Sequence, residues 1–200
     1  PEIGQCCGGR ADLAFEVADA ATVAAFLTRL EAETARQSSV FIFGGGHVGS
    51  ALAAALAPLP FNTVVVETRP DMVEALPEDV ELRISPLPEA EVANIPAGGA
   101  AVILTHDHAL DFLIATEELK RADLRYCGMI GSKTKRATFL RYAREQGLTE
   151  RQLSRLVMPI GGTTVSDKRP AVIAALVAAE LISVIHAAKA GRLHTADAAR

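Results

Sequence analysis

The sequence predicts an α/β protein built on a Rossmann-like, doubly wound parallel sheet. From residue 39 onward, short apolar runs alternate with longer helical patterns. Runs that are apolar throughout are typical of parallel strands buried on both faces. A glycine-rich segment, GGGHVG, separates the first of these runs from the first helical pattern, as in dinucleotide-binding folds. Hydrophobic residues make up 50% of the chain and charged residues 22%, an ordinary globular composition.

The first 37 residues have a different pattern. Residues 11–17 alternate in polarity and predict a half-buried strand, and residues 19–37 predict a helix with one apolar stripe. The stripe consists of Val23, Phe26, Leu27 and Leu30. We expect residues 1–37 to be the truncated end of an N-terminal domain, with a linker helix, and residues 38–200 to be the Rossmann-like domain.

The elements of the second domain follow in alternation. Strands are predicted at residues 40–43, 63–67, 80–84, 100–105, 124–130 and 155–160. Helices are predicted at residues 47–57, 71–76, 109–122, 132–147, from 149, and from 170 to Gly191. Ser132 is a predicted N-cap, and Thr149 with Gln152 a predicted capping box.

The last helix is apolar enough to need a membrane test. Residues 170–188 are rich in alanine and carry Glu180 near the middle, where a carboxylate facing lipid would be costly. We therefore predict a buried or interfacial helix and no membrane span. Glu180 on an apolar face must be paired or protonated; a basic partner is one interpretation and a pocket carboxylate the other.

Charge and composition exclude some classes of function. The formal net charge is −4, and the chain has no tryptophan and two tyrosines, so neither a basic surface nor a stacking platform indicates nucleic acid. No secretory signal is visible, and three cysteines do not form a disulfide framework. A cytoplasmic location is the default expectation.

The glycine-rich loop predicts a phosphate-binding site. Gly44, Gly46 and Gly49 fit the pattern G-x-G-x-x-G, which allows a tight turn, a close approach to pyrophosphate and close packing of helix on strand. The helix that follows supplies unpaired N–H groups. The predicted cofactor-binding residues are Gly44, Gly45, Gly46, His47, Val48 and Gly49. The alternative is a tight turn that binds nothing.

A carboxylate stands where a ribose would lie. Glu67 ends the next strand, about 20 residues after the second glycine, and is a candidate acceptor for ribose hydroxyls. Arg69 would favour a 2′-phosphate or is a surface charge, so the choice between NAD and NADP stays open.

Two further loops follow predicted strands. In GMIGSKTKR, Gly131, Ser132 and Lys133 form a second candidate anion site, the alternative being a surface helix with excess basic charge. In THDHALD, His106 and Asp107 would lie at the rim of the crevice at the carboxyl end of a strand. A helix cap by Asp107 or a polar pocket rim is favoured over a metal site, and no metal site is predicted.

Near the start of the chain, Cys6 and Cys7 precede two glycines. Adjacent cysteines suit metal or sulfur chemistry where glycines let the backbone fold around a ligand, and two small buried residues are the alternative.

Several segments together resemble the xanthine dehydrogenase accessory proteins, a family that includes carbon monoxide dehydrogenase maturation factors. The matching segments are GQCCGGR, GGGHVG, ETRP, LTHDHALD, YCGMIGSKTK, MPIGG and the helix containing AAE. They occur in the family's order from Pro1 to about His186. The strand-end acid is Glu67, where the family usually has Asp.

The resemblance implies a molybdenum-cofactor chaperone. Such proteins bind molybdopterin, protect it, support its sulfuration with a cysteine desulfurase and pass it to xanthine dehydrogenase or a related hydroxylase. The resemblance places the phosphate end of the molybdopterin cofactor at the glycine loop, and its molybdenum or a transferred sulfur near Cys6 and Cys7. A homodimer is expected. The competing interpretations are an NAD(P)-dependent oxidoreductase and a nucleotide-sensing regulatory module.

Overall fold

The computed structural model describes residues 12–15, 17–73 and 76–197. The chain divides into two compact units, Pro1–Arg36 and Gln37–Arg200. Each unit is described by itself.

The N-terminal unit contains one helix, α1 (Ala20–Ala35), among its described residues. Asp19 caps it by accepting a hydrogen bond from the Thr22 amide at 2.8 Å. The predicted strand at residues 11–17 is wrong, because the described residues there are not in a strand and Leu13, Phe15 and Val17 are exposed. An alternating pattern forms a strand only when a neighbouring strand accepts its hydrogen bonds, and none is paired with it among the described residues.

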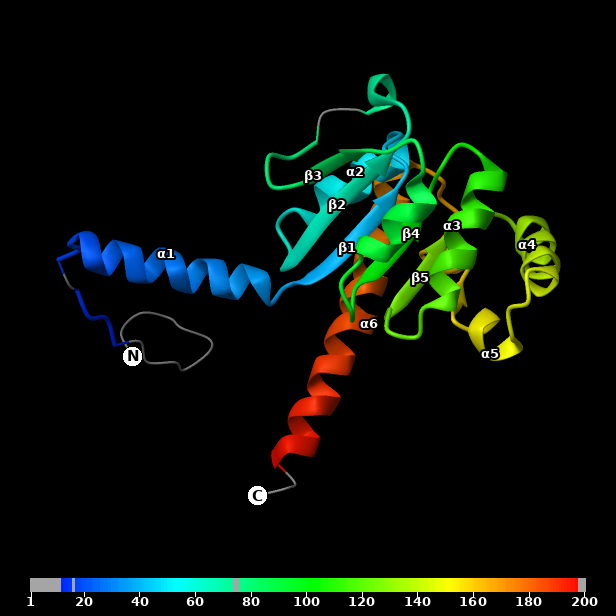
Figure 1. Cartoon of the computed structure of the whole chain (residues 1–200). Coiled ribbons are helices and arrows are strands. Elements are labelled where there is room, and N and C mark those ends of the chain that lie inside the picture. The colour runs from blue at the N-terminus through cyan, green and yellow to red at the C-terminus, as the bar shows by residue number, and fades with distance from the viewer. Residues whose placement is uncertain (1–11, 16, 74–75, 198–200) are drawn as a thin grey trace. The chain divides into compact units, whose positions relative to one another are not determined.

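The C-terminal unit contains a parallel sheet, which has six strands within the described residues (Figure 1). They are β1 (Ser38–Phe43), β2 (Phe61–Glu67), β3 (Glu81–Ile84), β4 (Ala100–Ile103), β5 (Tyr126–Met129) and β6 (Leu156–Val157). The order across the sheet is β3-β2-β1-β4-β5-β6. From β1 the chain adds strands outward on one side of the sheet, and from β4 it adds them on the other side, so the switch point lies between β1 and β4. In such folds ligands bind at the switch point, beside the carboxyl ends of the strands. The predicted Rossmann-like fold is confirmed.

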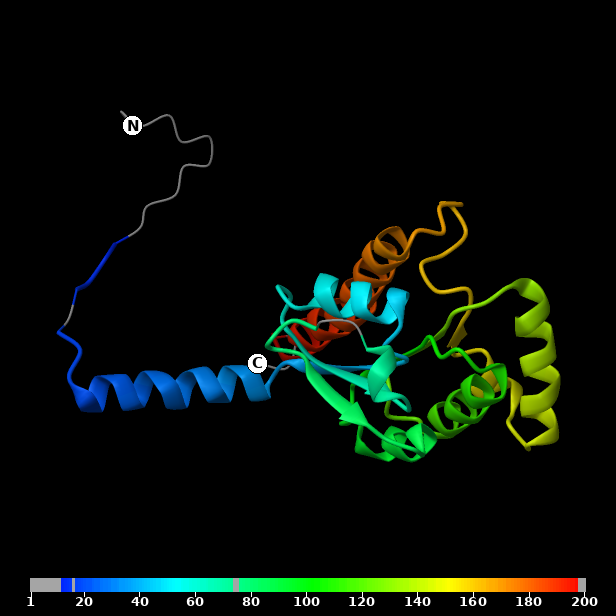
Figure 2. The same ribbon diagram turned by 90° about the horizontal axis from the view of Figure 1, so that it is seen from above.

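Helices cover both faces of this sheet (Figure 2). On one face lie α2 (His47–Leu56) and α6 (Pro170–Asp197), and on the other lie α3 (His108–Lys120), α4 (Lys133–Glu145), α5 (Glu150–Leu153) and the 3₁₀ segment η2 (Pro88–Asn94). The remaining short 3₁₀ segment is η1 (Pro70–Met72).

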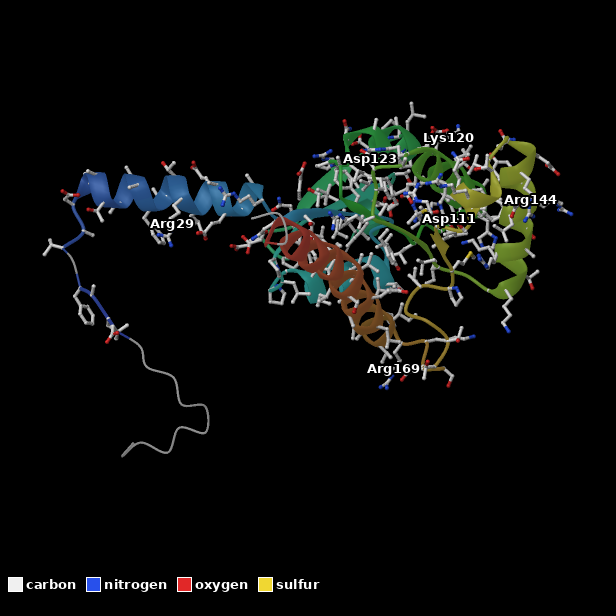
Figure 3. All side chains as sticks on the ribbon, turned by 90° about the horizontal axis from the view of Figure 1, so that it is seen from below. Arg29, Asp111, Lys120, Asp123, Arg144 and Arg169 are labelled. Atoms are coloured by element: carbon white, nitrogen blue, oxygen red, sulfur yellow. The ribbon has the colours of Figure 1, made fainter. Side chains whose placement is uncertain are left out.

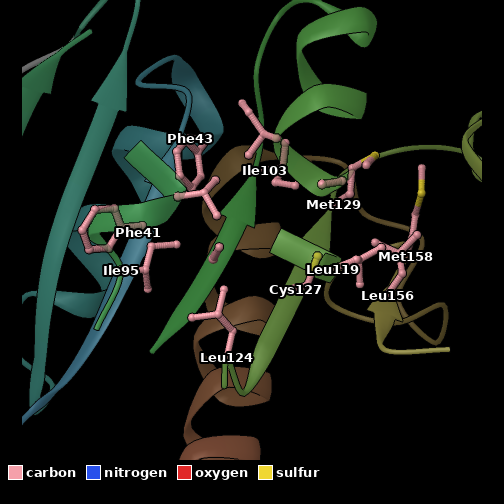
Figure 4. Close-up of a cluster of buried hydrophobic side chains, with 14 of the residues drawn as sticks. Phe41, Phe43, Ile95, Ile103, Leu119, Leu124, Cys127, Met129, Leu156 and Met158 are labelled. Atoms are coloured by element: carbon pink, nitrogen blue, oxygen red, sulfur yellow. The ribbon is translucent and has the colours of Figure 1, made fainter. Parts of the chain in front are cut away.

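Strand β1 shows how the sequence builds two cores. Val40 and Ile42 pack against α2 and α6, whereas Phe41 and Phe43 pack against the opposite layer. Side chains alternate between the faces of a strand, so a fully apolar run supplies both cores at once. Figure 4 shows the second core, in which Cys127 lies near Leu119, Leu124 and Leu156.

The local capping signals of the sequence are confirmed. Ser132 caps α4, and Thr149 and Gln152 form the predicted capping box of α5. Several boundaries differ from the prediction; the last strand, for example, is reduced from residues 155–160 to Leu156–Val157. The helix expected at residues 71–76 is reduced, among the described residues there, to η1, and α6 continues past Gly191 to Asp197.

Candidate functional site

The glycine loop joins β1 to α2 at the switch point of the sheet, and its glycines have different roles. Gly44 has φ of 114°, and a Cβ there would lie 2.6 Å from the Leu104 carbonyl oxygen. A Cβ at Gly49 would lie 1.9 Å from the Gly44 carbonyl oxygen. A Cβ at Gly46 would meet no described atom within 4 Å. Gly44 and Gly49 are therefore required by the fold, whereas the space at Gly46 is open to a ligand.

The N-terminus of α2 has the electrostatic character of an anion site. Gly46 is its N-cap residue, and no described side chain caps it. The Ser50 hydroxyl donates to the Gly45 carbonyl oxygen at 2.8 Å, which fixes the loop against the helix. The first-turn N–H groups of a helix lack partners within the helix, and the first turn here carries no acidic residue. Amides and helix dipole together favour negative charge beside Gly46.

Glu67 at the end of β2 is turned toward this loop. Its Oε2 accepts a hydrogen bond from the Gly45 amide at 2.9 Å. Its Oε1 accepts from the Thr68 amide at 2.8 Å, the Thr68 hydroxyl at 3.0 Å and the Arg69 amide at 3.1 Å. Burial raises the pKa of Glu67, but the backbone hydrogen bonds from Gly45, Thr68 and Arg69 outweigh it, so the pKa lies below its ordinary value. The carboxylate is therefore ionised and already engaged in holding the loop.

Arg69 lies close to the same carboxylate. Its Nε is 3.6 Å from Oε1 of Glu67, and the side chain is 37% exposed. This distance is too long for a hydrogen bond, so the pair is a loose ionic contact.

The loop after β4 provides a cap and an anchor. Asp107 accepts from the Ala109 amide at 2.8 Å and caps α3, as one of the interpretations of the sequence predicted. Thr105 donates its hydroxyl to Asp111 at 2.7 Å, and its amide donates to the same carboxylate at 3.1 Å. His106 is exposed.

The loop after β5 is held by a buried ion pair. Lys135 donates to Asp111 and, at 3.0 Å, to the Ile130 carbonyl oxygen. The Asp111 side chain is fully buried and that of Lys135 is 8% exposed. Figure 3 shows Asp111 surrounded by other side chains of the C-terminal unit. Lys135 is therefore a structural cation that joins α3, α4 and the β5 loop. Lys133, by contrast, is exposed and available to an anion.

A pocket of about 560 Å³ opens beside the glycine loop. Its walls come from the first turn of α2, the loop after β5, the segment after β6 and the start of α6. They comprise Val48, residues 130–132, residues 159–162, residues 165–168, Ile173 and Leu176. This volume lies within the range of small-molecule sites, about 300–1,000 Å³.

The predicted site residues fall into four groups. Five belong to the glycine loop and the start of α2: Gly44, Gly45, Gly46, His47 and Gly49. Val48, Gly131 and Ser132 line the pocket beside that loop. Five others are not part of the pocket lining: Glu67, Arg69, His106, Asp107 and Lys133. Cys6 and Cys7 lie outside the described residues.

Sequence reasoning gave no role to the pocket wall after β6. Gly161 and Gly162 both have positive φ, 71° and 74°, and form a turn that only glycine adopts readily. The two adjacent glycines of MPIGG were the sequence signal that could have predicted this turn. Glu180 of α6 holds this turn through its Oε2, which accepts from the Gly161 amide at 2.9 Å and the Tyr126 hydroxyl at 2.8 Å. Of the two interpretations of Glu180, a basic partner is wrong, because both of its donors among the described residues are neutral.

The described residues contain neither a metal-ligating cluster nor a helix fit to span a membrane. No group of three or more His, Cys, Asp or Glu side chains is placed there to hold a metal ion. None of the helices in that part of the chain has both the length and the apolar character needed to cross a membrane.

The strand order and the glycine loop at the switch point define a Rossmann-type α/β domain. A family model described as the XdhC Rossmann domain matches residues 40–181. The chain therefore belongs to the XdhC family.

Two relatives are similar over much of the chain. The uncharacterized protein YqeB of Escherichia coli K12 is 29% identical over 159 residues, which are 75% of this chain and 28% of that protein. A Bacillus halodurans chain described as a xanthine dehydrogenase has a crystal structure that matches with a TM-score of 0.63 and 26% identity, over 76% of this chain and 43% of that one. This chain thus corresponds to less than half the length of either relative.

Proposed function

We propose that this chain binds the molybdenum cofactor through its molybdopterin part and serves in the maturation of a xanthine dehydrogenase-type molybdenum hydroxylase. In this proposal the protein protects the cofactor, supports its sulfuration together with a cysteine desulfurase, and delivers it to the target enzyme. Membership of the XdhC family supports a role linked to xanthine dehydrogenase. So does the description of the Bacillus halodurans relative as a xanthine dehydrogenase.

One observation carries the proposal: the space at Gly46 is open, and Val48, two residues further along in the first turn of α2, lines a pocket large enough for a ring system. Molybdopterin has a phosphate at one end and a fused ring at the other. The uncapped N-terminus of α2 fits the phosphate, because no described side chain fills that space. The pocket that begins at Val48 fits the ring. When bound, the cofactor supplies the dithiolene sulfurs that hold molybdenum, and the residues of the chain bind and shield it.

The proposal gives the N-terminal residues a role through two cysteines, Cys6 and Cys7. We assign residues 1–37 to the end of the family's N-terminal domain, and Cys6 and Cys7 to the molybdenum or sulfur end of the cofactor. A homodimer is part of the same proposal. The apolar stripe of α1 is exposed within the described chain, and such a face is commonly covered by a partner.

An NAD(P)-dependent oxidoreductase is the competing function, because Gly44, Gly46, Gly49 and Glu67 match the dinucleotide pattern. In that function Glu67 would accept hydrogen bonds from a ribose. Its four hydrogen bonds to the backbone and to Thr68 favour a role in holding the loop instead. A nucleotide-sensing module would bind a dinucleotide without turning it over.

The proposal is tested by purifying the 200-residue chain without oxygen from a host that makes molybdopterin. The bound small molecules are then released and identified by mass spectrometry. Co-purifying molybdopterin supports the proposal. A nicotinamide dinucleotide in its place, with turnover of a reducible substrate, establishes the oxidoreductase, and a dinucleotide without turnover establishes the sensor.

A further inference from the structure

The pocket beside the glycine loop combines an apolar interior with one acidic group. Val48, Ile130, Ile160, Ile173 and Leu176 provide apolar surface for a flat ring. Among the described residues that line it, Asp167 carries the one carboxylate. A carboxylate is an acceptor on both oxygens, so it selects ligands that present two N–H donors side by side.

The present partner of Asp167 already shows this geometry. Arg169 donates through Nε to both carboxylate oxygens, at 3.1 Å and 2.9 Å, and through Nη2 to Oδ2 at 2.6 Å. The Arg169 side chain is 78% exposed, and Figure 3 shows it on the loop that leads into α6. An exposed pair of this kind contributes little to stability and is readily exchanged.

The edge of a guanidinium resembles the edge of one class of heterocycle. A 2-amino-4-oxopyrimidine ring, whether in a pterin or in guanine, presents a ring N–H beside an amino group, and thus two nearly parallel donors. Adenine presents an amino group beside a ring nitrogen that accepts, so it offers a carboxylate only one donor on that edge.

We propose that Asp167 recognises the aminopyrimidinone edge of the ring bound in this pocket, and that Arg169 occupies this edge when the pocket is empty. The inference rests on the proposed function, because it names the ring recognised at that site. It predicts selection of pterins and guanine over adenine, with Asp167 as the specificity-determining residue and Arg169 as its competitor.

The test is anaerobic equilibrium binding of molybdopterin to the 200-residue chain and three variants. Asp167→Asn replaces one acceptor by a donor and is expected to weaken binding about 10-fold to 100-fold. Arg169→Ala removes the competitor and is expected to strengthen it. Asp123→Asn is the matched control, because Asp123 forms the same kind of exposed pair with Arg121, at 2.6 Å, away from the pocket lining.

Competition by GMP and AMP separates guanine from pterin recognition, since the two nucleotides share the phosphate and differ in the base. GMP is expected to displace molybdopterin at concentrations at least about 10-fold lower than AMP, and Asp167→Asn is expected to abolish this difference. Molybdopterin binding that Asp167→Asn leaves unchanged, or equal competition by GMP and AMP, overturns the inference and leaves the proposed function standing. Failure of the wild-type chain to bind molybdopterin overturns both.

Discussion

The carboxylate of Glu67, at the end of β2, accepts a hydrogen bond from the amide of Gly45 at 2.9 Å. The acidic residue that the glycine pattern assigns to a ribose is thus a support of the glycine loop itself. The loop owes its shape to this bond on one side and to its close approach to Leu104 on the other.

Replacing Glu67 with Gln tests this support. The side chain is 5% exposed, so removing its charge while keeping its size is expected to cost about 1–3 kcal/mol of unfolding free energy at pH 7. The pKa of Glu67 is lowered in the fold, so its contribution is present above the ordinary value of 4.5 and lost as pH falls through the lowered pKa. Urea unfolding of both proteins across pH 7 to 3 is expected to show the difference shrinking at acid pH. A constant difference would contradict the assignment.

The three glycines of the pattern are expected to respond differently to alanine. Gly44→Ala places a side chain at positive φ against the Leu104 carbonyl oxygen, and Gly49→Ala places one against the Gly44 carbonyl oxygen. Both are expected to lower the unfolding free energy by about 2 kcal/mol or more. Gly46→Ala is expected to change it by less than about 1 kcal/mol, because the space there is open. Thermal and urea unfolding measure all three, and equal losses would refute the division of roles.

The pair formed by Lys135 and Asp111 is expected to dominate the stability of the β5 loop. Lys135→Met leaves a fully buried carboxylate without its cation and is expected to cost about 3–5 kcal/mol. Lys133→Met, two residues away and exposed, is the control and is expected to have little effect. The double variant Asp111→Asn with Lys135→Met is expected to lose less than the sum of the two single variants. Additive losses would show that the two side chains do not act as a pair.

Glu118 is expected to make stability depend on pH in the opposite sense to Glu67. It is fully buried, and apart from the neighbouring Cys127 thiol no described hydrogen-bond donor acts on its oxygens. Burial raises its pKa to about 8, against the effects of Cys127, Arg121 and Arg155. The folded state therefore holds a proton that the unfolded state releases, and stability falls as pH rises from about 4.5 to about 8.

Glu118→Gln removes this ionisation. In the wild type the unfolding free energy is expected to decline between pH 5 and 8, at a slope of up to about 1.4 kcal/mol per pH unit. In the variant this decline is expected to be absent. Urea unfolding at several pH values measures the slope. A variant with the same pH dependence as the wild type would show that Glu118 does not titrate there.

Sequence reasoning succeeded where the cause of a structure is local. Ser132 and Thr149 were predicted as caps, and a cap was one of the two interpretations of Asp107, because a cap depends on residues two or three positions away. The doubly wound parallel sheet was predicted from fully apolar runs separated by helices, a pattern that permits few topologies.

The errors have a common physical origin in distant partners. Residues 11–17 alternate as a strand does, but a strand also needs a neighbour, which a pattern cannot supply. Glu180 was expected to pair with a base, yet its partners, Tyr126 and Gly161, come from β5 and the turn after β6. The buried pair of Lys135 with Asp111 was not predicted, because the two residues are 24 positions apart in the sequence.

The central claim is that the amides beside Gly46 bind the phosphate of a carried cofactor, and anaerobic titration with molybdopterin tests it most directly. The decisive variant is Gly46→Ser, since serine is a good N-cap that preserves the helix while its hydroxyl takes the first-turn N–H groups. Ala54→Ser adds the same hydroxyl on an exposed position of α2 and is the control. We predict that Gly46→Ser weakens binding at least about 10-fold while Ala54→Ser binds as the wild type does. Equal affinity of all three proteins for molybdopterin would contradict the account.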